Sequence, residues 1–324
     1  MNLRTYNASR EIDRILSMLG IIFSIILIGL FIDKIAYVLT GFLVLISCII
    51  WLFIRKNATI ELNFPSSNFI NLKLSSFFFI ILALSILSIH LRPVLYERPL
   101  IYYLLVSIMV GVVALEVMYS QRVEGLILLQ IIIIGISIAW SQLLIFPSLV
   151  GVDPWSHQAL TLEIIHTNFI PSRYGYSKLP IFHLLIASTS LITGLNYKYS
   201  TMLSVSLAQI VCNCLFIFLL GKFLFKNSKI GLLASLFLII SDQHIYMSYW
   251  SIPNSFAAIF IPIIFYLSFK MISEMQVRRA ILLIIFMVAI ILTHSVTSMC
   301  ISIMLFVSWL VSILYNETKS IIEI

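Results

Sequence analysis

The sequence has few charged residues. Only 20 Lys and Arg and 13 Asp and Glu occur among 324 residues, whereas 61% of the chain is hydrophobic. So little polar surface cannot cover a water-soluble globule, which excludes most soluble enzymes and binding domains. The net charge of +7 would suggest a nucleic-acid partner in a soluble protein, but in a membrane protein basic residues mainly report topology. We therefore expect a polytopic membrane protein without a nucleic-acid partner.

Cysteine is also scarce. Cys48, Cys212, Cys214 and Cys300 all fall within apolar runs. Residues two apart point to roughly opposite sides of a helix, so Cys212 and Cys214 predict neither a disulfide nor a metal clasp. Glycine-rich phosphate loops, paired-cysteine motifs and a nucleophile elbow are absent. The cysteines are interpreted as packing residues.

Long apolar runs dominate what is present, and they predict an all-α bundle of roughly ten transmembrane helices. The first run is too long for the apolar part of a secretory signal peptide, so we expect it to remain as a helix. The predicted spans are 15–32, 35–54, 74–91, 100–118, 125–147, 199–220, 230–247, 255–272, 280–294 and 297–315.

The short run at 179–195 decides the topology. If it does not cross the membrane and the N-terminus is cytoplasmic, most of the 20 Lys and Arg lie inside, whereas a crossing would place most of them outside. The bias of basic residues toward the cytoplasm favours the first arrangement. We expect both termini in the cytoplasm and an extracytoplasmic loop at 148–198 containing amphipathic or re-entrant helices. The chain divides into a four-helix region, 1–120, and a module, 121–324, that carries the polar loops.

The extracytoplasmic loop is the polar island of the chain. Its stretch "VGVDPWSHQALTLEIIHTNFIPSRYGYSKLPIFH" predicts a surface helix with Asp153 as N-cap and Pro154 at the first helical position. A second helix is expected at about 178–195. Asp153 and His157 lie one turn apart on the first helix, so the two side chains share a face.

This order of elements resembles the GT-C glycosyltransferases, in particular archaeal and bacterial oligosaccharyltransferase catalytic subunits. The resemblance covers about residues 122–315. It rests on an acidic residue after a transmembrane helix, the stretch "NFIPSRYGYSKLP", and the later stretch "LIISDQHIYMSYWSIPNSFAAIFIPIIFY". Such enzymes usually continue beyond the position matching Ile324, so the chain would be a fragment or a shortened relative.

The resemblance implies a transferase that moves a sugar from a polyprenyl- or dolichyl-phosphate carrier to an acceptor at the outer face. Asp153 and His157 would be the catalytic pair, and a divalent metal such as Mg or Mn would be held by Asp153, His157 and Asp242. The expected contacts to substrate and lipid phosphate are Arg173, Lys178, Tyr174, Tyr176, Trp250, Asn254 and His294. The later stretch, which would form the second external loop, lacks the further carboxylates that the family carries there.

Each assignment has a structural alternative. Asp153 can simply cap its helix, and His157 can be an interfacial polar residue. Arg173 and Lys178 can anchor the loop at lipid headgroups, and Trp250 fits an aromatic belt.

Three polar residues in the apolar runs receive structural interpretations. Glu116 is expected to snorkel to the cytoplasmic surface, and Gln209 and Asn213 to form interhelical hydrogen bonds. At the level of the whole protein, the alternatives to a transferase are a non-catalytic assembly subunit with a degenerate GT-C fold and a secondary transporter.

Overall fold

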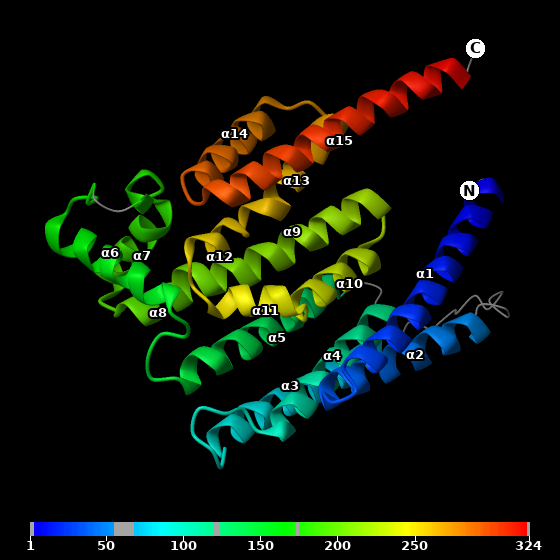
Figure 1. Ribbon diagram of the computed structural model, residues 1–324, viewed down its shortest axis with the longest axis horizontal. Helices are drawn as coiled ribbons and strands as arrows, with labels where there is room; N and C mark the ends of the chain where they lie inside the picture. The colour runs from blue at the N-terminus through cyan, green and yellow to red at the C-terminus, as the bar shows by residue number, and fades with distance from the viewer. Residues whose placement is uncertain (1–2, 55–67, 120–122, 173–174, 323–324) are drawn as a thin grey trace. The chain divides into compact units, whose positions relative to one another are not determined.

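The computed structural model describes residues 3–54, 68–119, 123–172 and 175–322, and helices are the only regular secondary structure in these ranges (Figure 1). The first compact unit, Met1–Phe64, contains α1 (Leu3–Leu30) and α2 (Ile35–Ile54), which pack against each other as a hairpin. The second unit is Pro65–Ile324. The boundary predicted near residue 120 separates the part of the chain that carries the polar loops, whereas the boundary after Phe64 reflects packing. The predicted boundary stays a prediction.

The second unit contains all the remaining elements. They are α3 (Asn68–His90), α4 (Leu100–Tyr119), α5 (Glu124–Ile145), α6 (Asp153–Thr167), η2 (Gly175–Lys178), α7 (Ile181–Thr193), α8 (Tyr197–Thr201), η3 (Met202–Ser206), α9 (Leu207–Phe225), α10 (Ser228–Ile239), α11 (Asp242–Tyr249), α12 (Pro253–Ala257), α13 (Phe260–Ser273), α14 (Val277–Ile291) and α15 (Ser295–Ile322). The short element η3 is a π-helical turn that continues directly into α9.

Five helical segments in the described part of the chain are long and apolar enough to cross a membrane, and a sixth is formed if the bent pair α10 and α11 counts as one span. The five are Leu72–His90, Leu100–Tyr119, Glu124–Ile145, Tyr197–Phe225 and Pro253–Ser273. The other predicted runs correspond to the shorter apolar segments Arg14–Leu30, Tyr37–Phe53 and Ser295–Val311 and to α14. A multi-pass membrane protein is therefore confirmed, and the count of ten crossings stays a prediction.

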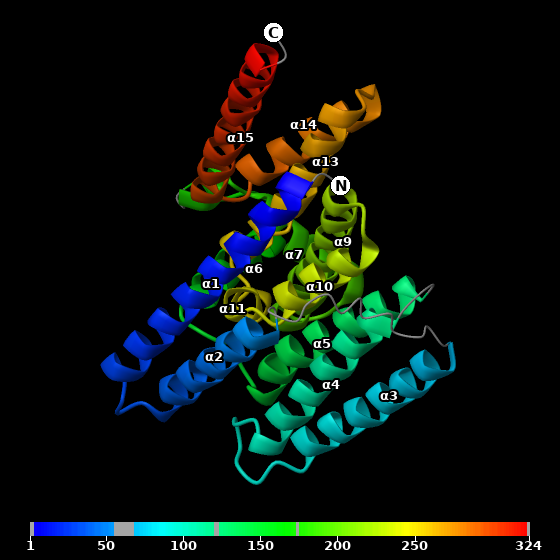
Figure 2. The same ribbon diagram turned by 90° about the vertical axis from the view of Figure 1, so that its right-hand side faces the viewer.

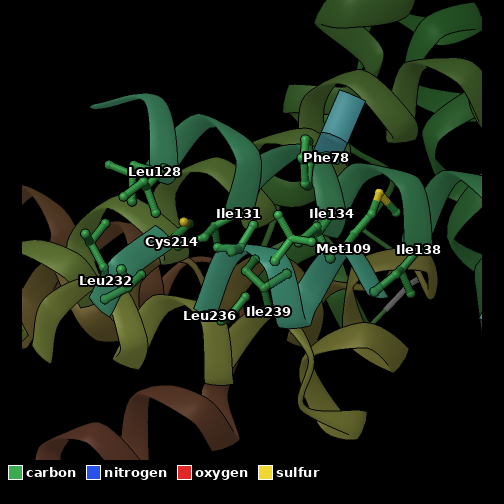
Figure 3. Packing of buried hydrophobic residues seen from close by; sticks show 14 of the residues in the cluster. Phe78, Met109, Leu128, Ile131, Ile134, Ile138, Cys214, Leu232, Leu236 and Ile239 are labelled. Atoms are coloured by element: carbon green, nitrogen blue, oxygen red, sulfur yellow. The ribbon is translucent and has the colours of Figure 1, made fainter. Parts of the chain in front are cut away.

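The main apolar core of the second unit lies between α3, α4, α5, α9 and α10, with α5 in contact with α4, α9 and α10 (Figures 1 and 2). Figure 3 shows side chains of this cluster, among them Phe78, Met109, Ile131, Cys214 and Ile239. Helices α9 and α10 approach each other closely at two glycines, since a Cβ added to Gly221 would lie 2.9 Å from Cα of Gly231. Small residues allow such close helix packing in membranes.

A buried carboxyl group lies at one end of this core and corrects the sequence interpretation. Glu116 is 1% exposed and does not snorkel. Ser75 of α3 donates a hydrogen bond to its Oε1 at 2.8 Å, and Nε2 of Gln130 on α5 donates at 3.3 Å. Two neighbouring helices supply donors inside the bundle, so the side chain is turned inward.

The two ends of the polar loop between α5 and α8 lie side by side. Lys198 at the start of α8 donates from its ammonium to the backbone carbonyl of Phe146, just after α5. Helices α6 and α7 pack against each other within the loop (Figure 1), and α7 has 13 residues, too few to cross about 30 Å of hydrocarbon as a helix. The chain leaves and rejoins the bundle at the same end.

Basic residues gather at the opposite end of the same bundle. Lys222, near the end of α9, pairs with Glu124 at the start of α5 at 2.7 Å. The ammonium of Lys229 donates to the backbone carbonyl of Met118 at 2.6 Å. This is the distribution that the predicted orientation requires, because basic residues favour the cytoplasmic side. The orientation itself remains a prediction.

Candidate functional site

Helix α6 carries the first two predicted site residues. It begins at Asp153, preceded by Val152, so the predicted N-cap is wrong by one residue and Pro154 lies at the second helical position. No side-chain capping bond forms at this end of the helix. At the other end, Asn168 adopts a left-handed conformation with φ of 58° and ends the helix. Asp153 has no capping role that would occupy its carboxylate.

Asp153 and His157 share one face of α6 but have different surroundings. The Asp153 side chain is exposed and forms no hydrogen bond or ion pair within the part of the chain that the structure describes. His157 is buried, and desolvation lowers its pKa to about 4; the nearby Asp153 charge opposes this lowering and His294 adds to it. The exposed Asp153 carboxylate therefore lies one turn from an imidazole that is uncharged at neutral pH.

The partner of His157 is a second histidine on α7. Nδ1 of His157 lies 3.0 Å from Nε2 of His183, which is fully buried. Burial and, to a smaller extent, the nearby His157 lower the pKa of His183 to about 3. The rings of Tyr176 and Phe182 pack edge-on against His157. Both imidazoles are neutral at pH 7 and share one hydrogen bond.

The unpaired nitrogen of His183 indicates where the protons lie. Its Nδ1 is buried and has no hydrogen-bond partner among the described residues. A buried N–H without an acceptor is rarer in proteins than a buried acceptor without a donor. We therefore assign the proton of His183 to Nε2, where it is donated to Nδ1 of His157. His157 then carries its own proton on Nε2, the nitrogen that His183 does not contact.

The short loop between α14 and α15 reaches the same region. The amide of Ile181 at the start of α7 donates to the carbonyl of Leu292 at 3.4 Å. Two residues later, Nδ1 of His294 lies 2.8 Å from the hydroxyl of Thr297, which donates to Oδ1 of Asn254 at 2.8 Å. His294 and Asn254, both predicted site residues, are therefore linked through Thr297.

Trp250 joins the second polar loop to the start of α6. Gly151 has a φ of +89°, and a Cβ added there would lie 2.6 Å from Nε1 of Trp250. A conformation with positive φ and a close approach of this kind both favour glycine. The turn before Asp153 and the turn at Trp250 therefore lie at the same end of the bundle.

Four predicted residues remain. Lys178 is exposed at the end of η2, and Arg173 and Tyr174 lie outside the described residues. Asp242 lines a separate cavity of about 450 Å³ together with Arg98. No group of three His, Cys, Asp or Glu side chains in the described ranges is placed to hold a metal ion. The residues present do not form the predicted Mg or Mn site.

Sequence reasoning missed His183. The signal was its position as a lone imidazole in the apolar stretch "LPIFHLLIASTSLITGL", 26 residues after His157. Nothing in that spacing predicts a contact between the two rings, because the turn that folds α7 onto α6 sets the distance.

The chain matches no known family model, and no curated protein or solved structure is significantly similar to it. Its helices show a multi-pass helical membrane protein with five or six candidate spans.

Proposed function

We propose that the chain is a membrane transferase that moves a sugar from a polyprenyl- or dolichyl-phosphate carrier to an acceptor at the extracytoplasmic face. The observation that supports this most is the free Asp153 carboxylate one turn from the neutral His157, whose ring is fixed by His183. An exposed carboxylate beside an oriented imidazole suits proton transfer to and from a substrate. Sugar transfer from a lipid phosphate needs such a group near the membrane surface.

In the proposed reaction, the acceptor hydroxyl oxygen forms a bond to the anomeric carbon of the sugar. The bond between that carbon and the phosphate oxygen breaks, and the lipid phosphate leaves with the electron pair. Asp153 takes the proton of the acceptor hydroxyl as general base. Nε2–H of His157 donates a hydrogen bond to an oxygen of the sugar or phosphate. Lys178, exposed at the end of η2, supplies a cation toward the leaving phosphate.

The test is sugar transfer by the purified full chain in lipid nanodiscs. The donors are dolichyl-phosphate hexoses carrying a radiolabelled sugar, offered with a membrane extract as the acceptor source. Wild-type protein should consume the donor and release dolichyl phosphate. Asp153→Asn should reduce the rate by about 10²- to 10⁴-fold, because it removes a general base while keeping the shape of the side chain.

The matched control is Glu97→Gln, which neutralises another exposed carboxylate in the loop before α4. It should transfer at the wild-type rate. Equal rates for Asp153→Asn and wild type would remove the proposed base. The transferase proposal would be contradicted if wild-type protein that elutes as a folded species in gel filtration consumes none of the donors. That result would favour the assembly subunit.

A further inference from the structure

A separate cavity lies at the base of the bent pair α10 and α11, away from the α6 and α7 site. It has a volume of about 280 Å³ and is lined mainly by residues of α9, α10, α11 and α13. Four of its lining residues follow one stripe of α9 at positions i, i+4, i+8 and i+11, which share a face of a helix. They are Gln209, Asn213, Ile217 and Leu220.

Three polar groups at this cavity lack partners. Oε1 of Gln209, Oδ1 of Asn213 and Nε2 of His244 are buried and have no hydrogen bond to any residue that the structure describes. The three residues are 1%, 4% and 7% exposed. Among the residues that the structure describes, these oxygens therefore accept none of the interhelical hydrogen bonds expected for Gln209 and Asn213. An unsatisfied polar group costs several kcal/mol in hydrocarbon, so an occupant that bonds to these groups would be strongly favoured.

The character of the lining changes along α9. Gln209 and Asn213 line the cavity from the half of α9 nearer the polar loops, and Ile217 and Leu220 line it from the other half; His244 of α11 and Phe265 of α13 also line it. Water fills polar cavities but leaves apolar ones dry, so water does not fit both halves. No described lining residue carries a charge, and a phosphate would require a cation. The lining therefore matches a molecule with an uncharged hydroxyl group and a hydrocarbon chain.

We infer that this cavity binds a single-chain lipid alcohol that enters from the bilayer, with its hydroxyl between Gln209, Asn213 and His244 and its chain along Ile217 and Leu220. The hydroxyl donates to one carboxamide oxygen and accepts from a neighbouring N–H. The site does not depend on the proposed transferase activity, because none of its residues belongs to the α6 and α7 site.

Photo-crosslinking of the full chain in nanodiscs tests this inference. The probe is hexadecanol carrying a diazirine and an alkyne, and labelled peptides are mapped by mass spectrometry. Label is expected on α9 and α13 and should fall at least about fivefold with excess unlabelled hexadecanol, but not with hexadecyl phosphate or hexadecane. Gln209→Leu and Asn213→Leu should each reduce the label about fivefold, as expected for one lost hydrogen bond.

The matched control is Gln276→Leu, which makes the same replacement at an exposed position before α14 and should label as wild type does. Equal competition by hexadecane would show that the cavity accepts any hydrocarbon chain, and competition by hexadecyl phosphate would show a phosphate site. Either result, or absence of label on α9, overturns the inference. If the Leu variants do not fold, the competition on wild-type protein decides alone.

Discussion

The ammonium of Lys198 bonds to the carbonyl of Phe146, so the first residues of α8 lie beside the residue that follows α5. The loop between them leaves and rejoins the bundle at one end, and Lys178 within it should lie on the opposite side of the membrane from Lys226, just after α9. In a background without the four native cysteines, Lys178→Cys should react with an impermeant maleimide on intact cells. Lys226→Cys should react only after permeabilisation.

Glu97→Cys is the matched control, because its loop contacts the same end of the bundle through the stacked rings of Tyr96 and Phe146. It should label as Lys178→Cys does. Labelling of Lys226→Cys on intact cells together with Lys178→Cys would mean that the loop crosses the membrane, and the proposed site would not exist.

The histidine pair should make stability depend on pH. The pKa of His157 falls to about 4 in the folded chain and that of His183 to about 3, both below the ordinary value of 6.5. At pH values between about 4 and 6.5 the unfolded chain binds more protons than the folded chain. The free energy of unfolding therefore falls as the pH decreases over this range. We expect a loss of about 5 kcal/mol by about pH 4.5 from the two histidines together, seen as a lower midpoint of thermal unfolding in detergent.

The double variant His157→Gln, His183→Gln should flatten this acid dependence, because glutamine does not titrate and can keep the hydrogen bond. His166→Gln, an exposed position on the same helix, serves as the control and should keep the full dependence. An identical pH profile in the double variant and the wild type would show that the pair does not control acid stability.

The polar loop shows what the sequence could predict. Pro154 and the apolar spacing located α6 to within one residue, and charge counting kept 179–195 out of the count of spans, consistent with a 13-residue α7. These features are local or depend on composition. The contact between His157 and His183 depends on how the chain turns between two helices, which no local pattern specifies.

Glu116 shows the same limit inside the bundle. Its position near a helix end made an outward side chain the natural expectation, but the donors on α3 and α5 that hold it inward are 41 and 14 residues away. The same holds for Asp242, which tertiary packing places at one cavity with Arg98.

The contact of Gly151 with Trp250 should make the glycine hard to replace. Gly151→Ala adds a Cβ at 2.6 Å from Nε1 of Trp250 and forces alanine into a φ of +89°. Such strained positions cost about 1–3 kcal/mol, so the thermal midpoint should decrease. Gly175→Ala is the matched control, because an added Cβ there has nothing within 4 Å. Equal midpoints for the two variants would contradict the close approach.

The buried position of Glu116 predicts that its shape and hydrogen bonding matter more than its charge. Glu116→Gln keeps an oxygen that can accept from Ser75 and Gln130, and its amide can donate to the unpaired oxygen of Gln130, so stability should change by less than about 1 kcal/mol.

Glu116→Ala leaves the donors of Ser75 and Gln130 without an acceptor in an apolar core, which costs about 1–3 kcal/mol for each group. Glu124→Ala is the matched control: it removes the carboxylate that pairs with Lys222 at the surface, and exposed ion pairs contribute about 0–1 kcal/mol. Thermal unfolding of the three variants in one detergent should therefore rank Glu116→Ala well below the other two. If Glu116→Ala and Glu124→Ala unfold at the same temperature, Glu116 faces the surface and the inward arrangement is wrong.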